Sequence, residues 1–85
     1  MIRVSRNISL TGERVVTIEG HATGDDLPEV TAAINAGGPG CIIDAAGLKS
    51  VDAAAREFLA GLKRKGTAIR GASMYVRALI EEPQQ

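Results

Sequence analysis

Aromatic residues are nearly absent from this 85-residue chain, which has one Phe, one Tyr and no Trp. The core must therefore be aliphatic, and the many alanines allow helices to pack close to a sheet. The single Cys41 excludes an internal disulfide, and no Cys/His set has the spacing of metal ligands. Ten basic residues balance ten acidic ones, without a basic stripe, so nucleic acid is not an expected partner.

Long apolar runs are also absent, which excludes a membrane-spanning segment. The first residues, 1–4, lack the apolar stretch of a signal peptide. We therefore expect a cytoplasmic protein without direct membrane insertion. The length predicts a single domain over residues 1–82, followed by a polar tail at 83–85.

The first quarter of the chain has the pattern of a β-hairpin. Apolar and polar residues alternate over 2–10, residues 11–13 are typical of a turn, and residues 14–19 predict a second strand. Residues 20–24 are rich in glycine and are expected to form a loop that carries His21.

Two helices and a short strand are predicted for the middle of the chain. Asp26 and Glu29 have the spacing of a capping box at the start of a helix that runs to about Ala36. The apolar run 41–45 predicts a central strand, and 47–51 a loop. Asp52 is a suitable N-cap for the second helix.

The last third of the chain predicts the end of the second helix, a strand and a final helix. Gly66 closes the second helix, with basic residues in its last turn. Residues 67–70 form a fourth strand, and Ser73 caps a helix that buries Val76, Leu79 and Ile80.

The element order β-β-α-β-α-β-α predicts an α/β fold, a small mixed four-stranded sheet with helices packed mainly on one face. Val16, Ile18, Ile43 and Ile69 should point toward the helices. The other face is half polar and is expected to be solvated, with Asp44 and Arg70 facing each other on neighbouring strands. Thr17 and Glu19 are expected on the same face.

Catalysis and cofactor binding are not expected from these residues. His21 is the only histidine and has no Ser or Cys partner nearby in the chain. Helix capping accounts for the adjacent carboxylates of Asp25 and Asp26. The glycines at 37–40 precede a strand, whereas a phosphate-binding loop precedes a helix.

Three segments in this order resemble a known family. They are Cys41-Ile42-Ile43-Asp44, Val51-Asp52-Ala53-Ala54, and the stretch from Gly66 to Ser73. Together with the element order, they are similar to the STAS domain of bacterial anti-sigma factor antagonists and of sulfate transporter tails. The resemblance covers nearly the whole chain and is best over residues 62–82. It implies a STAS-like fold and a regulatory protein that binds another protein.

The chain departs from the STAS pattern at the switch position. In regulated antagonists a partner kinase phosphorylates a hydroxyl just after the family's Asp, which changes binding to an anti-sigma factor. Asp52 matches that Asp, but Ala53 and Ala54 stand at the hydroxyl positions and cannot accept phosphate. Ser50 is a generic loop serine, displaced from the usual site, and is the alternative acceptor. Longer members also add a strand and a helix, so the sheet edge at 67–70 is expected to be open or covered by another chain.

The resulting hypothesis is a non-catalytic module for protein interaction, unswitched by phosphorylation at the usual site. Its partner would be an anti-sigma factor, a related kinase or a transporter component, and a homodimer is an open alternative. The other hypotheses are a small-ligand or nucleotide-binding domain and a STAS-like subunit of a lipid-transport complex. The expected partner-binding residues lie where the strands end: His21, Asp25, Ser50, Val51, Asp52, Ala53 and Ala54.

Overall fold

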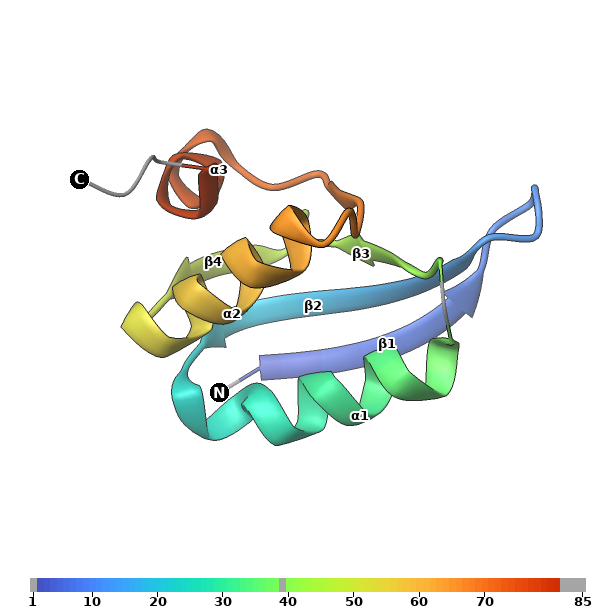
Figure 1. Ribbon diagram of the computed structural model, residues 1–85, viewed down its shortest axis with the longest axis horizontal. Coiled ribbons are helices and arrows are strands. Elements are labelled where there is room, and N and C mark those ends of the chain that lie inside the picture. Colours follow the sequence, from blue (N-terminus) through green and yellow to red (C-terminus); the bar gives the residue numbers. More distant parts are fainter. Residues whose placement is uncertain (1, 39, 82–85) are drawn as a thin grey trace.

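The computed structural model describes residues 2–38 and 40–81, which form a small mixed α/β fold (Figure 1). The tail predicted at 83–85 lies outside the described residues. The elements are β1 (Ile2–Ile8), β2 (Arg14–Ala22), a 3₁₀ turn η1 (Gly24–Asp26), α1 (Leu27–Gly37), β3 (Ile42–Asp44), β4 (Leu48–Val51), α2 (Ala53–Arg64), β5 (Ile69–Arg70) and α3 (Met74–Glu81).

The sheet is built around β2. Strand β1 pairs antiparallel with β2 as the predicted hairpin, and β3 pairs parallel with the other side of β2. Strand β5 continues the sheet as a parallel neighbour of β3. Strand β4 also pairs with β2, beyond the end of β3. The sheet therefore has five strands, and the prediction of four was wrong.

The additional strand arises from a segment that was predicted as a loop. Thr17 lies opposite Asp44, but Gly20 lies opposite Leu48, so the chain between β3 and β4 contains one residue more than the facing part of β2. Within β4, Leu48 and Ser50 lie opposite the consecutive residues Gly20 and His21, so Lys49 forms a bulge that interrupts the alternation by which a strand is identified. Leu48 is buried, and its side chain anchors β4 in the core.

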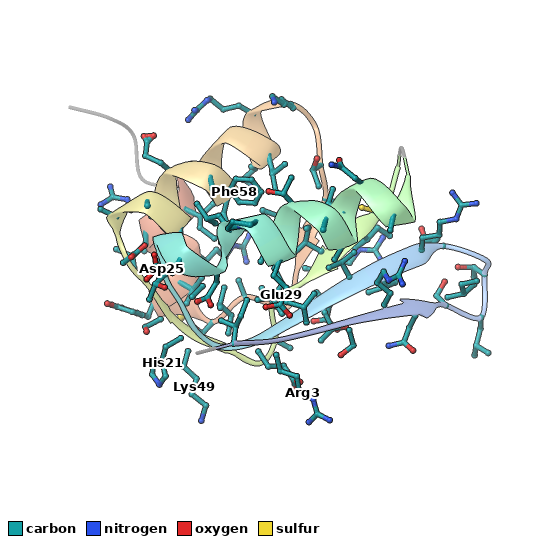
Figure 2. All side chains as sticks on the ribbon, turned by 90° about the horizontal axis from the view of Figure 1, so that it is seen from below. Arg3, His21, Asp25, Glu29, Lys49 and Phe58 are labelled. Carbon is teal, nitrogen blue, oxygen red and sulfur yellow. The ribbon has the colours of Figure 1, made fainter. Side chains whose placement is uncertain are left out.

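The helices cover one face of the sheet. Helix α1 packs on β1 and β2, whereas α2 packs on β4 (Figures 1 and 2). Helix α3 contacts α2 and β4 at the side of the sheet. The largest fully buried side chains are those of Ile18, Ile43, Val16 and Val76. The first three of these were predicted to face the helices.

The predicted start and end of α2 and the predicted start of α3 are confirmed, but the prediction of a capping box at α1 was wrong. Asp52 and Ser73 each accept a hydrogen bond from a backbone amide in the first turn of their helix, and Gly66 has a φ of 97° after α2. Asp26 makes no side-chain cap to α1. Its carboxylate accepts from the amide and hydroxyl of Thr23, because η1 starts the helical path one turn earlier.

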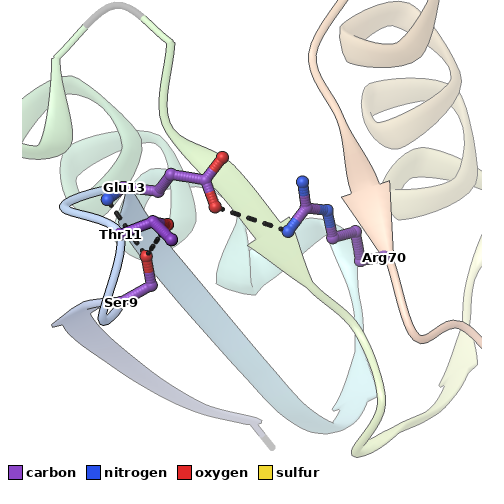
Figure 3. Close-up of polar contacts among 4 residues, drawn as sticks. All are labelled: Ser9, Thr11, Glu13 and Arg70. Atoms are coloured by element: carbon purple, nitrogen blue, oxygen red, sulfur yellow. Dashed lines mark hydrogen bonds and ion pairs between the residues drawn. The ribbon is translucent and has the colours of Figure 1, made fainter.

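An ion pair on the polar face of the sheet joins residues that are far apart in the sequence. Arg70 lies opposite Asp44 in the register, as predicted. Its guanidinium, however, lies 3.5 Å from the carboxylate of Glu13 (Figure 3). Since β3 lies between β2 and β5, this ion pair spans β3. Asp44 instead accepts a hydrogen bond from the amide of Ala46.

Candidate functional site

The sheet register brings the predicted partner-binding residues together at one end of the molecule. His21 lies opposite Ser50, and Ala22 lies opposite Val51. Asp52 follows β4 directly and starts α2, while Asp25 lies in η1 after β2. We call this surface the rim, defined by the residues His21, Asp25, Ser50, Val51, Asp52, Ala53 and Ala54.

His21 and Ser50 form a hydrogen bond across the strands that carry them. The distance from His21 Nδ1 to Ser50 Oγ is 2.6 Å, and both side chains are at the surface. The prediction that His21 lies in a loop was wrong, because it belongs to β2, and the serine that it contacts is not one of its neighbours in the chain. The two residues are 29 positions apart and meet only through the pairing of β2 with β4. When Nδ1 is unprotonated, it accepts the bond, and Ser50 donates.

Asp52 joins two separate segments of the rim. Its Oδ1 accepts a hydrogen bond of 2.9 Å from the amide of Ala55, the expected N-cap bond. Its Oδ2 accepts a second bond of 2.9 Å from the amide of Gly24 in η1. The bond from Ala55, followed by that from Gly24, lowers the pKa of this carboxyl group below its ordinary value. Asp52 therefore holds η1 against the start of α2.

A close contact between Gly24 and Ala54 packs η1 against the helix. A Cβ built on Gly24 would lie 3.1 Å from the Cβ of Ala54, which is tighter than most real contacts of this kind. Sequence reasoning did not select Gly24 because its amide and its missing side chain matter only in the folded rim. Ala53 and Ala54 nevertheless remain exposed, so the rim presents two methyl groups beside a carboxylate.

The charged side chains around the rim have different surroundings. Asp25 is exposed, whereas Asp26 is partly buried and bound to Thr23. Lys49 precedes Ser50 on β4 and was not selected from the sequence. Figure 2 shows its side chain beside His21, on the side of the sheet away from the helices. The carboxylates of the rim therefore have a cation, Lys49, as a neighbour on β4.

The start of α2 is poorly suited to hold a phosphate. Backbone amides at a helix N-terminus ordinarily attract anions. Here the Asp52 carboxylate already accepts from Ala55 and Gly24, and its negative charge would repel a phosphate placed beside it. Over residues 2–38 and 40–81, no group of three or more His, Cys, Asp or Glu side chains is arranged to hold a metal ion.

A shallow hollow extends the rim along α2. Its volume is about 150 Å³, and it is lined by Ala53, Arg56, Glu57 and Ala60. These residues recur at helical spacing, so the hollow follows one side of the first two turns of α2, from the exposed Ala53 to the buried Ala60. A partner segment that contacts Ala53 would also reach Arg56 and Glu57.

Comparison of the chain with protein-family models, with curated proteins and with solved structures gives no match. Among the described helices, none combines the length and apolar character needed to cross a bilayer.

Proposed function

We propose that this protein is a non-catalytic, cytoplasmic interaction module similar to the anti-sigma factor antagonists, and that it binds its partner protein through the rim. The supporting observation is the double hydrogen bond of Asp52, which links η1 to α2 without a ligand. A preformed surface loses less conformational entropy on binding than a mobile one. The exposed methyl groups of Ala53 and Ala54 let a partner backbone approach closely.

The proposed interaction is constitutive at the usual switch position. Ala53 and Ala54 have no hydroxyl group, and Ser50 lies on β4, with its hydroxyl bonded to His21. Control of the interaction would then come from the partner or from the amount of protein. The chemistry at the start of α2 favours a protein partner over a nucleotide, because Asp52 repels phosphate. A subunit role in a lipid-transport complex remains the alternative within the same class of module.

Titration with ATP-dependent anti-sigma kinases tests this proposal. Isothermal calorimetry should detect binding of one such kinase without ATP, and Ala54→Glu should weaken it at least tenfold through bulk and charge at the centre of the rim. Ala32→Glu is the matched control, because Ala32 is an exposed position on α1 that lies outside the rim. Equal affinity of folded Ala54→Glu and Ala32→Glu would refute the rim as the interface.

Incubation of the same pairs with radiolabelled ATP tests the constitutive character. No phosphate should be incorporated into the wild-type protein. Labelling that disappears in Ser50→Ala would show that Ser50 replaces the usual acceptor, and the interaction would then be a regulated one.

A further inference from the structure

The turn between β1 and β2 projects beyond the helices at the end of the molecule opposite the rim. Figure 1 shows the hairpin continuing past the end of α1. We call residues 8–14 the hairpin tip. Two of the four exposed large apolar side chains of the described residues are here, with Ile8 73% exposed and Leu10 fully exposed. An aliphatic pair at the end of a projecting hairpin faces water on several sides.

The hairpin tip is held in one conformation by its own hydrogen bonds. The amide of Ser9 donates to the carbonyl of Glu13, and the amide of Gly12 donates to the carbonyl of Ser9. The Ser9 hydroxyl accepts from the Glu13 amide at 3.0 Å and lies 3.0 Å from the hydroxyl of Thr11 (Figure 3). These bonds pair the amides of Ser9, Gly12 and Glu13 within the turn, which lowers the cost of burying the tip in an apolar surface.

Two arginines lie on the helix-facing side of the hairpin, with Arg14 beside Ile8 and Arg6 two residues behind Ile8 along β1. Arg14 is the register partner of Ile8, and Arg6 is the partner of Val16. Both arginines are exposed, and Arg14 donates to the carbonyl of Gly37, the last residue of α1. They line a hollow of about 560 Å³ between the hairpin and the end of α1.

The side chains around this hollow favour an anion, whereas the carbonyl end of α1, to which Arg14 donates, adds partial negative charge beside it. None of its lining residues among those described is acidic. The nearest carboxylate in sequence, that of Glu13, is engaged by Arg70 on the other side of the sheet. The hollow therefore combines two guanidinium groups with aliphatic side chains, and Arg matches the geometry of a phosphate group well.

We propose that the hairpin tip binds an anionic lipid surface, with Ile8 and Leu10 in the interface and Arg6 and Arg14 at the phosphate groups. A strand rises about 3.3 Å per residue, so Arg6 lies about 7 Å behind Ile8 along β1. Arginine side chains extend toward the phosphates while their stems cover apolar surface. This order of apolar and cationic groups matches the acyl boundary and the headgroup layer of a membrane.

A membrane fits this surface better than a protein partner because the apolar pair is convex. A protein would need a cavity of matching shape, whereas lipids rearrange around a projecting side chain. The contact is peripheral and shallow, and it revises the expectation of no direct membrane insertion. It goes beyond the proposed function, because the hairpin tip and the rim lie at opposite ends of β2 and can be occupied together.

Sedimentation with lipid vesicles tests the proposal on the full-length protein. The protein should bind vesicles of equimolar phosphatidylglycerol and phosphatidylcholine, bind phosphatidylcholine vesicles much more weakly, and dissociate as salt is raised. Leu10→Ser should weaken binding about tenfold or more through lost apolar burial. Arg6→Gln should weaken it about fivefold and reduce its dependence on salt.

Two matched variants serve as controls. Met74→Ser removes a side chain that is 89% exposed at the start of α3, and Arg3→Gln removes a cation from the opposite face of β1. Both should bind as the wild type does, and circular dichroism should show that all four variants are folded. Absence of binding to the anionic vesicles, or equal losses in the control and tip variants, would overturn the proposal.

Discussion

The contact between Gly24 and Ala54 allows a quantitative test of how the rim is assembled. In Gly24→Ala, the new methyl group would lie 3.1 Å from the Ala54 Cβ, although ordinary contacts begin near 3.4 Å. The two segments must therefore move apart by a few tenths of an ångström, against the hydrogen bond from Gly24 to Asp52. We expect a steric cost of about 1–2 kcal/mol, as for mild overpacking.

The measured loss should be smaller than this cost. Ala also restricts the unfolded chain, which offsets about 0.4–1 kcal/mol, so Gly24→Ala should lose about 0.5–1 kcal/mol in urea unfolding followed by circular dichroism. A double-mutant cycle with Ala54→Gly cancels the unfolded-state effect and isolates the contact. The double variant should be more stable, by about 1–2 kcal/mol, than the sum of the two single effects predicts. Additivity within about 0.5 kcal/mol would refute the close contact.

Three further predictions concern pH, the core and the ion pair. The pKa of Asp52 is lowered in the folded protein, so its contribution to stability is present above its unfolded pKa, about 4, and is lost as pH falls through the folded value. Asp52→Asn should therefore lose less stability than the wild type on acidification. Equal profiles of stability against pH for the two proteins would contradict this. Ile43→Ala should cost about 2–5 kcal/mol in urea unfolding because its side chain is fully buried, whereas exposed Ile8→Ala should cost less than about 0.5 kcal/mol. Glu13→Gln should change stability by less than about 0.5 kcal/mol, since its ion pair with Arg70 is exposed, and a larger change would show that the bridge over β3 is structural.

Local patterns in the sequence predicted most of the elements. The hairpin, three helices and the caps at Asp52 and Ser73 depend on neighbours within one or two turns, and all of these features are present. The helix-facing positions Val16 and Ile43 also follow from simple alternation, and both are buried. Such features are encoded by periodicity and capping, which one sequence contains.

The errors concern features that depend on distant pairing. Strand β4 was missed because it contains a bulge at Lys49 and its four residues show no clear alternation. The same bulge sets the bond between His21 and Ser50, which no local pattern contains. Arg70 was matched with its register neighbour Asp44, but its long side chain reaches Glu13 across β3. The position of the rim residues at one end of the sheet and the N-cap bond of Asp52 could be predicted, whereas the bond from Gly24 to Asp52 and that between His21 and Ser50 could not.

The pairing of β2 with the β3–β4 segment is irregular, so the length of the chain between β3 and β4 affects the core and the rim differently. Six steps along the chain lead from Asp44 to Ser50, whereas four steps along β2 connect their partners Thr17 and His21. The pairing of Ile43 with Val16 in the core precedes this irregularity along the chain, whereas the pairing of Ser50 with His21 in the rim follows it. An insertion or deletion at Ala46 can therefore shift the position of Ser50 relative to His21 while Val16 and Ile43 stay paired. A change of length there would reshape the rim, but the buried side chain of Leu48, which anchors β4 in the core, limits how far β4 can shift.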